Sequence, residues 1–291
     1  MGETKALLPN PAHPASMGLP AARSAGTEFQ VKHISSRSNP AFKALRALAT
    51  DMREVRQQGR TLIDGPHLVQ SYIDRLGAPH SLVMSASALL KPEIVDLQAK
   101  LPDVSKLSLA DDLFQEVSGV KTPVGVLAVI AIPEQPDGEI TGDCVILESV
   151  QDSGNVGAIL RTAAAAGVRD IFLSDGCAAV WSPRVLRAAQ GAHFGLRIRE
   201  RVDLPGMLVT YGGMSVATVA HDGVSLFELD LSQRVAWVFG NEGAGLSRTV
   251  TDLATHRASI PVSGAVESFN VAAAAAICLF ERVRRTVAPA K

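Results

Sequence analysis

The sequence predicts an α/β protein built from two parts, a larger C-terminal half with a parallel sheet and a smaller N-terminal α/β half. Two observations support this fold class. From position 144 onward, short apolar runs alternate with helical stretches, a pattern typical of a parallel sheet covered by helices on both faces. The 291 residues, 47% of them hydrophobic, are also enough for about two domains with real cores.

The N-terminal half is predicted to span residues 29–133. Residues 1–28, rich in Ala, Pro, Gly and Ser, show little periodicity, so we expect a disordered arm there. Apolar residues at three- and four-residue steps then predict one basic amphipathic helix over residues 40–58. The other elements expected in this half are strands over 61–64, 81–85 and 124–132 and a helix over 66–76.

The C-terminal half is predicted to span residues 142–291, after a linker over residues 134–141 where prolines and a glycine interrupt a polar stretch. A final helix over residues 268–287 is apolar in its first part and basic in its second, as suits a helix C-terminus. The strands expected before that helix are the apolar runs 144–150, 170–174, 215–220, 235–240 and 258–262.

Composition excludes several classes of protein. Lys+Arg 28 and Asp+Glu 29 leave a net charge of −1, so gross charge indicates no partner. No apolar run approaches the roughly 20 residues that cross a bilayer, and no secretory signal is legible. The three cysteines are far apart, so we expect buried thiols in a cytoplasmic protein and no metal site. The short apolar runs predict no membrane contact.

Common catalytic motifs are also missing. The chain has neither the glycine fingerprint of dinucleotide sites nor the phosphate-binding loop of nucleotide hydrolases. It also lacks the nucleophile elbow of serine hydrolases and the paired histidines of zinc proteases. His193 and His221 are isolated in the sequence, so both are interpreted as structural.

Three polar clusters remain, each where a predicted strand ends, which is where open α/β sheets bind ligands. The first cluster spans residues 147–161. Asn155 lies in the turn and Arg161 follows on the helix within two turns, so both can face one pocket. Taken alone, the same residues also fit an ordinary turn and a surface cation.

The other two clusters follow later strands. Residues 238–247 contain three glycines that allow a ligand to approach the backbone closely, with Glu242 among them. Residues 260–274 end a strand and begin a helix that Ser268 or Glu267 is expected to cap. The alanines in that helix are interpreted as core packing.

In order and spacing, the three clusters resemble the signature motifs of the SpoU (TrmH) branch of the SPOUT RNA methyltransferases. The resemblance covers residues 144–286. The preceding half resembles, more loosely, the substrate-binding domain often fused to that unit, at residues 64–69 and 120–126. The three matching segments are N-V-G-A-I-L-R at 155–161, G-N-E-G-A-G-L-S at 240–247 and I-P-V-S-G-A-V-E-S-F-N-V at 260–271.

The resemblance implies a trefoil-knotted C-terminal domain that binds S-adenosylmethionine (AdoMet) and methylates a ribose 2′-oxygen of structured RNA. In this interpretation Glu242 orients Arg161. Arg161 either takes the 2′-hydroxyl proton or stabilises the developing alkoxide and a phosphate. The implied catalytic residues are Asn155, Arg161, Glu242, Ser268 and Asn270. The implied cofactor-binding residues are Thr218, Gly240, Asn241, Gly243, Ile260, Val262 and Phe269.

Local charge supports RNA contact where net charge does not. Residues 29–60 carry seven Lys or Arg against two acidic residues, and residues 181–201 carry five against one. The RNA contacts expected from these stretches are Lys32, Arg37, Lys43, Arg46, Arg184 and Arg187.

We expect 23S ribosomal RNA as the substrate, with transfer RNA as the alternative. A non-catalytic RNA-binding protein on the same scaffold is a second alternative, and the presence of all five polar catalytic positions argues against it. A small-molecule enzyme with an adenosine cofactor would not explain the basic helix. A homodimer through the C-terminal half is expected because residues 271–280 are apolar on nearly every side of their helix.

Overall fold

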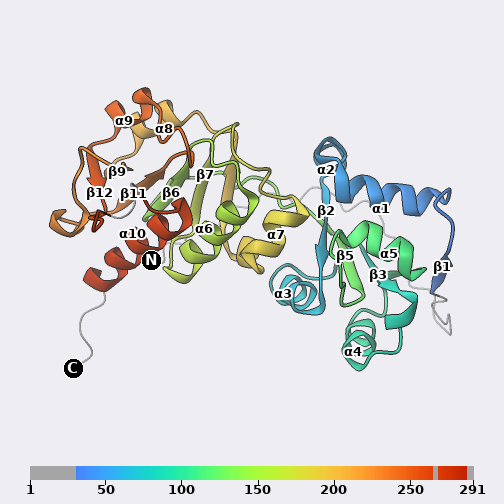
Figure 1. Cartoon of the computed structure of the whole chain (residues 1–291). Helices are drawn as coiled ribbons and strands as arrows, with labels where there is room; N and C mark the ends of the chain where they lie inside the picture. The colour runs from blue at the N-terminus through green and yellow to red at the C-terminus, as the bar shows by residue number, and fades with distance from the viewer. Residues whose placement is uncertain (1–30, 265–267, 287–291) are drawn as a thin grey trace, which may run out of the picture.

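The computed structural model describes residues 31–264 and 268–286, which form two neighbouring sheets with their helices (Figure 1). The predicted disordered arm therefore lies outside the described residues. The elements of the N-terminal half are β1 (Lys32–Ile34), α1 (Pro40–Thr50), α2 (Met52–Gln58), β2 (Arg60–Asp64), α3 (Pro66–Leu76), β3 (Ser81–Ser85), η1 (Ala86–Ala88), α4 (Pro92–Lys100), β4 (Ser105–Leu109), α5 (Asp111–Ser118) and β5 (Val126–Ala131).

The first sheet is mixed, with the strand order β1-β4-β3-β5-β2. β1, β4 and β3 run parallel, while β5 is antiparallel to β3 and β2. The prediction of one helix over residues 40–58 is wrong. Asp51 has extended backbone angles and its side chain accepts a hydrogen bond from the Arg53 amide, so it ends α1 and caps α2.

The C-terminal half begins at β6 and ends with the long helix α10. Three predicted strands are confirmed with shorter bounds, as β6, β7 and β11, whereas β9 and β12 begin one and two residues before the predicted runs and β12 shares only residues 258–259 with its prediction. β8 and β10 had no predicted counterpart. The elements are β6 (Cys144–Leu147), α6 (Ser153–Ala165), β7 (Asp170–Leu173), α7 (Pro183–Ala189), η2 (Ala192–Gly195), β8 (Arg197–Glu200), α8 (Leu204–Thr210), β9 (Met214–Thr218), β10 (Val224–Ser225), η3 (Leu226–Glu228), β11 (Val235–Phe239), α9 (Arg248–Leu253), β12 (His256–Ser259) and α10 (Val271–Thr286).

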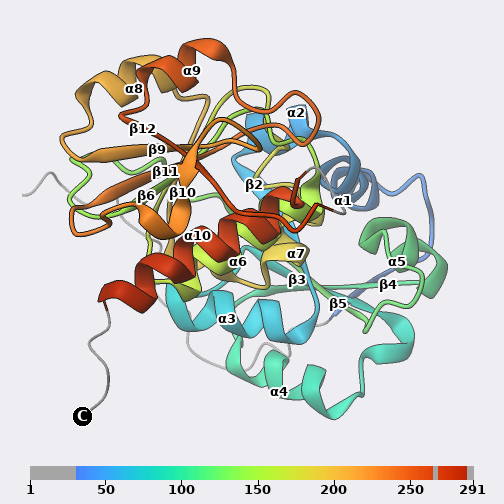
Figure 2. The ribbon, with the colours of Figure 1, turned by 60° about the vertical axis from the view of Figure 1, so that its left-hand side comes forward.

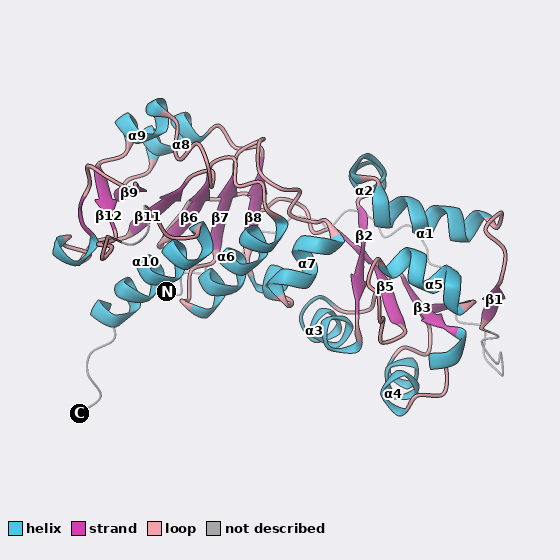
Figure 3. Cartoon of the chain, in the orientation of Figure 1, coloured by secondary structure: helices cyan, strands magenta, loops and turns pink. Residues whose placement is uncertain are grey.

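The second sheet is parallel throughout, in the order β10-β12-β9-β11-β6-β7-β8, with helices on both faces (Figure 3). Successive side chains of β6 point to opposite faces. Cys144 and Ile146 join the core under α8 and α9, whereas Val145 and Leu147 join the core under α6, α7 and α10. The predicted parallel sheet with two covered faces is confirmed.

The two halves pack against each other through α7, which lies between the two sheets (Figure 1). Thr61 on β2 donates a buried hydrogen bond of 2.8 Å to the carbonyl of Trp181. Arg187 on α7 donates to Asp64 Oδ2 at 3.1 Å and to the Ser118 carbonyl at 3.0 Å. Apolar side chains from both halves form one continuous hydrophobic cluster. The halves are therefore joined by a packed interface as well as by the chain.

The predicted linker, residues 134–141, contains no helix or strand. Arg199 donates to the carbonyl oxygens of Pro136 at 2.7 Å and Gly138 at 3.1 Å, which ties this segment to β8. The division into domains at this segment stays a prediction.

α10 lies along α6 on one face of the second sheet (Figure 2). Val271, Ala275, Cys278 and Leu279 form its buried face. Phe280, on another side, is 47% exposed. One side of the helix is thus left uncovered by this chain, and the homodimer stays a prediction.

Candidate functional site

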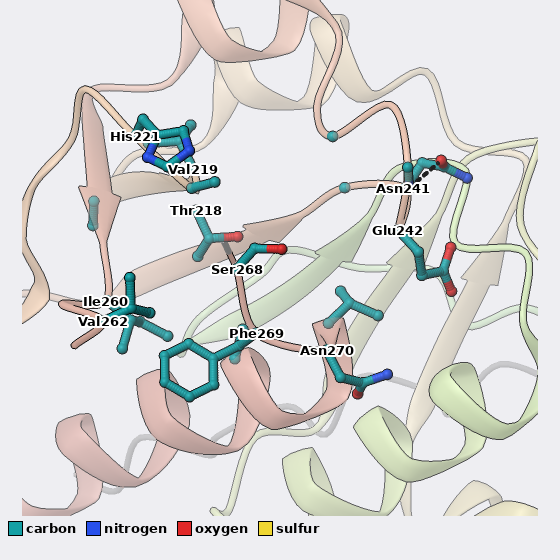
Figure 4. Close-up of a pocket in the computed structure, with 17 residues that line it drawn as sticks. Thr218, Val219, His221, Asn241, Glu242, Ile260, Val262, Ser268, Phe269 and Asn270 are labelled. Carbon is teal, nitrogen blue, oxygen red and sulfur yellow. Dashed lines mark hydrogen bonds between the residues drawn. The ribbon is translucent and has the colours of Figure 1, made fainter. Parts of the chain in front are cut away.

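A cavity of about 490 Å³ opens where β9, β11 and β12 end at the carboxyl edge of the second sheet (Figure 4). Such an edge is the usual ligand site of open α/β sheets. All seven predicted cofactor residues line this cavity. They are Thr218, Gly240, Asn241, Gly243, Ile260, Val262 and Phe269. The two clusters that are distant in sequence, residues 238–247 and 260–274, therefore meet in one place.

The glycine-rich turn after β11 is held by Asn241. Its side-chain oxygen accepts from the amides of Gly243 and Ala244, both at 2.9 Å, and its Nδ2 donates to the Ser149 carbonyl at 2.8 Å. The Asn241 and Gly245 backbones also exchange two hydrogen bonds, of 2.9 and 3.0 Å. The turn is thus fixed to the end of β6 before any ligand binds.

The fold of the turn itself requires glycine at position 240. A Cβ at this position would lie 2.4–2.6 Å from backbone atoms of Gly245 and Leu246, which leaves no space for a side chain. At Gly243, by contrast, a Cβ would meet only Asn241 Oδ1, at 3.6 Å. Gly243 is therefore the glycine whose substitution changes the cavity more than the turn.

Three polar side chains from three separate segments form a chain of hydrogen bonds beside the cavity. Asn270 Nδ2 donates to Asn155 Oδ1 at 3.0 Å, and Asn155 Nδ2 donates to Glu242 Oε1 at 2.9 Å. Glu242 also accepts longer bonds from the amides of Asp152 at 3.4 Å and Gln151 at 3.5 Å. Glu242 and Asn270 line the cavity, and Asn155 connects them from α6.

The Glu242 carboxylate stays ionised in this setting. Partial burial by itself raises its pKa, but the hydrogen bonds from Asn155 and the two amides together outweigh that effect and lower the pKa below its ordinary value. The site therefore presents a negative charge beside the cavity at neutral pH.

Ser268 lines the cavity, but it does not cap the last helix as predicted. Asn270 does so, because its Oδ1 accepts from the amides of Ala272 at 2.9 Å and Ala273 at 3.3 Å. Glu267, the other predicted cap, lies outside the described residues. Asn270 thus serves both α10 and the polar chain.

Arg161 does not join Asn155 at the cavity. It is exposed on α6, and among the described residues no ion pair connects it to Glu242. Six residues of α-helix advance about 9 Å and turn about 600°, which leaves the two side chains roughly 120° apart around the axis. Neither Asn155 nor Arg161 is among the residues that line this cavity, and the expectation that both face one pocket stays a prediction.

The predicted RNA contacts separate into two groups. Lys32, Lys43, Arg46 and Arg184 are exposed. Arg37 and Arg187 instead pair with carboxylates, as do three arginines around β8 that had contributed to the local charge. The pairs are Arg37 with Asp112 and Glu116, Arg187 with Asp64, Arg197 and Arg199 with Asp170, and Arg201 with Asp175. Arg187 thus links the two halves of the chain, and its predicted contact with RNA stays a prediction.

Sequence reasoning missed several lining residues. His221 lines the cavity although it was interpreted as structural, and Val219 and Ala220 line it beside Thr218. Their position directly after β9 was the available signal, since neighbouring parallel strands end at one edge. His193 is buried at 2% exposure, and its Nε2 is 2.9 Å from the Val180 carbonyl, which agrees with the structural interpretation.

Three further features concern membrane spans, metal sites and cysteines. Among the described residues, no helix is long and apolar enough to cross a membrane. Within the same part of the chain, no group of three His, Cys, Asp or Glu side chains could hold a metal ion. The three cysteines are free, and burial raises the pKa of each thiol.

Comparison with known proteins identifies the family. Residues 143–280 match the model of the SpoU rRNA Methylase family. The chain is 33% identical to an uncharacterized tRNA/rRNA methyltransferase of Synechocystis, over 88% of this chain and 94% of that protein. It is 30% identical to a 23S rRNA (guanosine(2553)-2′-O)-methyltransferase of Bacillus subtilis, over 86% and 98% of the two chains.

Solved structures agree with this result. An AdoMet-bound rRNA methyltransferase from Sinorhizobium meliloti matches with a TM-score of 0.78 and 27% identity, over 89% of this chain and 100% of that one. A SpoU methyltransferase from Streptomyces viridochromogenes in complex with AdoMet matches with a TM-score of 0.77 and 25% identity, over 85% and 98%. The chain therefore belongs to the SpoU family of RNA methyltransferases.

Proposed function

We propose that this chain transfers a methyl group from AdoMet to the ribose 2′-oxygen of a structured RNA. The observation that carries the proposal is the hydrogen-bonded chain Asn270–Asn155–Glu242 at the edge of the cavity. It joins all three motif clusters at one point. A cofactor pocket and a set of polar groups for a ribose thus lie next to each other.

The cavity fits AdoMet in size and lining. Its volume of about 490 Å³ lies within the roughly 300–1,000 Å³ common for small-molecule sites. Ile260, Val262 and Phe269 supply apolar surface for an adenine ring, and Phe269 is 40% exposed. Gly240 and Gly243 leave backbone groups accessible for the polar parts of the ligand. Two relatives of known structure are described as AdoMet-bound.

The residues around the cavity position the reactants. When bound, AdoMet supplies an electrophilic methyl group, so the reaction depends chiefly on in-line geometry. Asn155, Ser268 and Asn270 orient the ribose and the cofactor. Glu242 holds Asn155 and the loop before α6, in place of the direct contact with Arg161 that the resemblance implied.

Arg161 remains the residue that we assign to the reacting oxygen. It projects from the same helix as Asn155 and is exposed, so an RNA phosphate can reach it. A guanidinium is costly to deprotonate, whereas its donors suit a phosphate or a developing alkoxide. Both roles, proton acceptor and alkoxide stabiliser, predict loss of methyl transfer when the side chain is removed.

Ribosomal RNA is the proposed substrate, with 23S rRNA favoured over transfer RNA. Two relatives that match most of this chain at 30% identity or more are described as a tRNA/rRNA methyltransferase and a 23S rRNA methyltransferase. Lys32, Lys43, Arg46 and Arg184 offer exposed positive charge for the RNA backbone. A homodimer that covers Phe280 and the exposed side of α10 completes the proposal, in a cytoplasmic setting that suits three free thiols.

Purified protein with labelled AdoMet and separate pools of ribosomal and transfer RNA tests this proposal. We expect label in 23S rRNA, and mapping of the product should locate it at a ribose 2′-oxygen. Label in transfer RNA alone would mean that transfer RNA, and not ribosomal RNA, is the substrate. RNA binding without any label would favour the non-catalytic alternative.

A further inference from the structure

A second cavity, of about 190 Å³, lies between the two halves of the chain. The N-terminal half contributes Met52, Val55 and Arg56 from α2 and Ile132 from the end of β5. The C-terminal half contributes Trp181, which precedes α7, and Glu200, the last residue of β8. We call it the inter-sheet cavity.

Glu200 places one wall of the inter-sheet cavity at the same edge of the parallel sheet as the AdoMet cavity. The strand registers pair Phe239 with Leu147, Leu147 with Leu173, and Leu173 with Glu200. Glu200 is therefore three strands away from Phe239 in one row, a distance of about 14 Å at about 4.8 Å per strand. Gly240, which lines the AdoMet cavity, directly follows Phe239. An RNA strand along this edge would pass both cavities within a few nucleotides.

The lining of the inter-sheet cavity suits a flat, partly polar ring. Met52, Val55, Ile132 and Trp181 supply apolar walls. Trp181 is only 8% exposed and is held against His193, with ring centroids 5.1 Å apart. A volume below the roughly 300 Å³ of drug-sized pockets leaves space for one ring system and little more.

Glu200 makes this cavity selective for a hydrogen-bond donor. Its carboxyl is partly buried, and burial raises its pKa despite the opposing influence of the Val180 backbone and of the nearby charges of Arg56 and Arg201. A partly desolvated carboxylate favours a ligand with N–H groups. Among nucleobases, guanine presents two adjacent N–H donors, at N1 and N2, that match the two oxygens of a carboxylate.

Arg56 completes the site from α2. Its side chain is exposed at the cavity, and Arg53 on the same helix is exposed as well. Arg56 at the cavity and Arg53 elsewhere on α2 offer contacts for the phosphates near a captured base.

We propose that the inter-sheet cavity binds an extruded guanine of the substrate RNA, a few nucleotides from the methylated ribose. This inference rests on the proposed function, because it takes RNA as the ligand. It adds a specificity site that spans the interface between the halves, so the packed α7 interface would set the spacing between the recognised base and the methylated ribose.

Tryptophan fluorescence of the full chain tests the inference with guanosine 5′-monophosphate as the probe. The chain has two tryptophans, and Trp237 is completely buried, so a change caused by a ligand in this cavity should come from Trp181. S-adenosylhomocysteine in excess keeps the other cavity filled. We expect saturable quenching, roughly tenfold tighter for guanosine than for uridine monophosphate, and no quenching in Trp181→Phe.

Two matched variants distinguish recognition of the base by Glu200 from general electrostatics. Loss of one negative charge should strengthen RNA binding slightly if only general electrostatics matter. Glu54→Gln removes an α2 carboxylate outside the cavity and should behave in that way. Glu200→Gln should instead weaken guanosine monophosphate binding about tenfold and slow methylation of total RNA, with AdoMet affinity unchanged.

The outcomes separate the inference from the proposed function. If wild type methylates RNA but no nucleotide quenches Trp181, or if Glu200→Gln behaves like Glu54→Gln, the inference fails and the function stands. Equal binding of all four monophosphates would overturn the guanine assignment. Selective quenching by guanosine monophosphate without any methyl transfer would support the cavity and contradict the function.

Discussion

Arg187 and Arg184 lie three residues apart on α7, and the structure places them in different surroundings. Arg187 pairs with Asp64, whose side chain is 11% exposed, while Arg184 is exposed. Breaking a fully buried pair costs about 3–5 kcal/mol and an exposed pair about 0–1 kcal/mol. Because the Arg187 side chain is 34% exposed, Arg187→Gln should lower the free energy of unfolding by about 2 kcal/mol. Arg184→Gln should change it by less than about 0.5 kcal/mol.

Urea unfolding and RNA binding at several salt concentrations measure the two effects separately. Arg184→Gln should weaken RNA binding and reduce the slope of log affinity against log salt by about one ion, since one phosphate contact is lost. Arg187→Gln should leave that slope unchanged under conditions where it is folded. The reasoning is refuted if Arg187→Gln unfolds like wild type and loses RNA affinity as much as Arg184→Gln.

Three further predictions follow from the site and the core. Burial lowers the pKa of His193 to about 4 from 6.5. Its contribution to stability is therefore complete above pH 6.5 and is lost as pH falls toward 4, by up to about 3 kcal/mol. Urea unfolding at several pH values should show this loss in wild type and a smaller loss in His193→Gln. Gly243→Val should weaken AdoMet binding at least tenfold in calorimetry with little change in stability, whereas Gly240→Ala should destabilise the fold by about 1–3 kcal/mol because its Cβ meets backbone. Phe280→Glu should shift a dimer to monomer in sedimentation of the full chain, and a wild type that is already monomeric would end the dimer proposal.

Much of the fold was predictable because local pattern and tertiary structure agree. The apolar runs of the second sheet are buried on both faces, so the strands are legible without any partner. The helix over residues 40–58 was predicted as continuous because its apolar spacing continues through Asp51, and periodicity does not register that a capping side chain can restart a helix. β8 was missed because alternating arginines hide its single buried residue, Ile198.

The site was predictable to the extent that its residues follow strand ends. The cavity residues come from the end of β9, the glycine-rich turn after β11 and the segment after β12, and their convergence follows from parallel strands ending at one edge. The partner of Glu242 was not predictable, because it depends on how α6 turns Asn155 toward the cavity and Arg161 away. The role of Arg187 was hidden for a different reason: its carboxylate partner lies 123 positions earlier in the sequence, beyond any local charge count. The trefoil knot stays a prediction from the resemblance.

Methyl transfer by wild type and Arg161→Ala, measured with labelled AdoMet and ribosomal RNA and followed by mapping of the modified nucleotide, tests the central claim most directly. We predict that wild type places the label on one ribose 2′-oxygen, and that Arg161→Ala places none while its AdoMet affinity stays within a few-fold of wild type. Label on a base, or wild-type turnover in Arg161→Ala, would contradict the account.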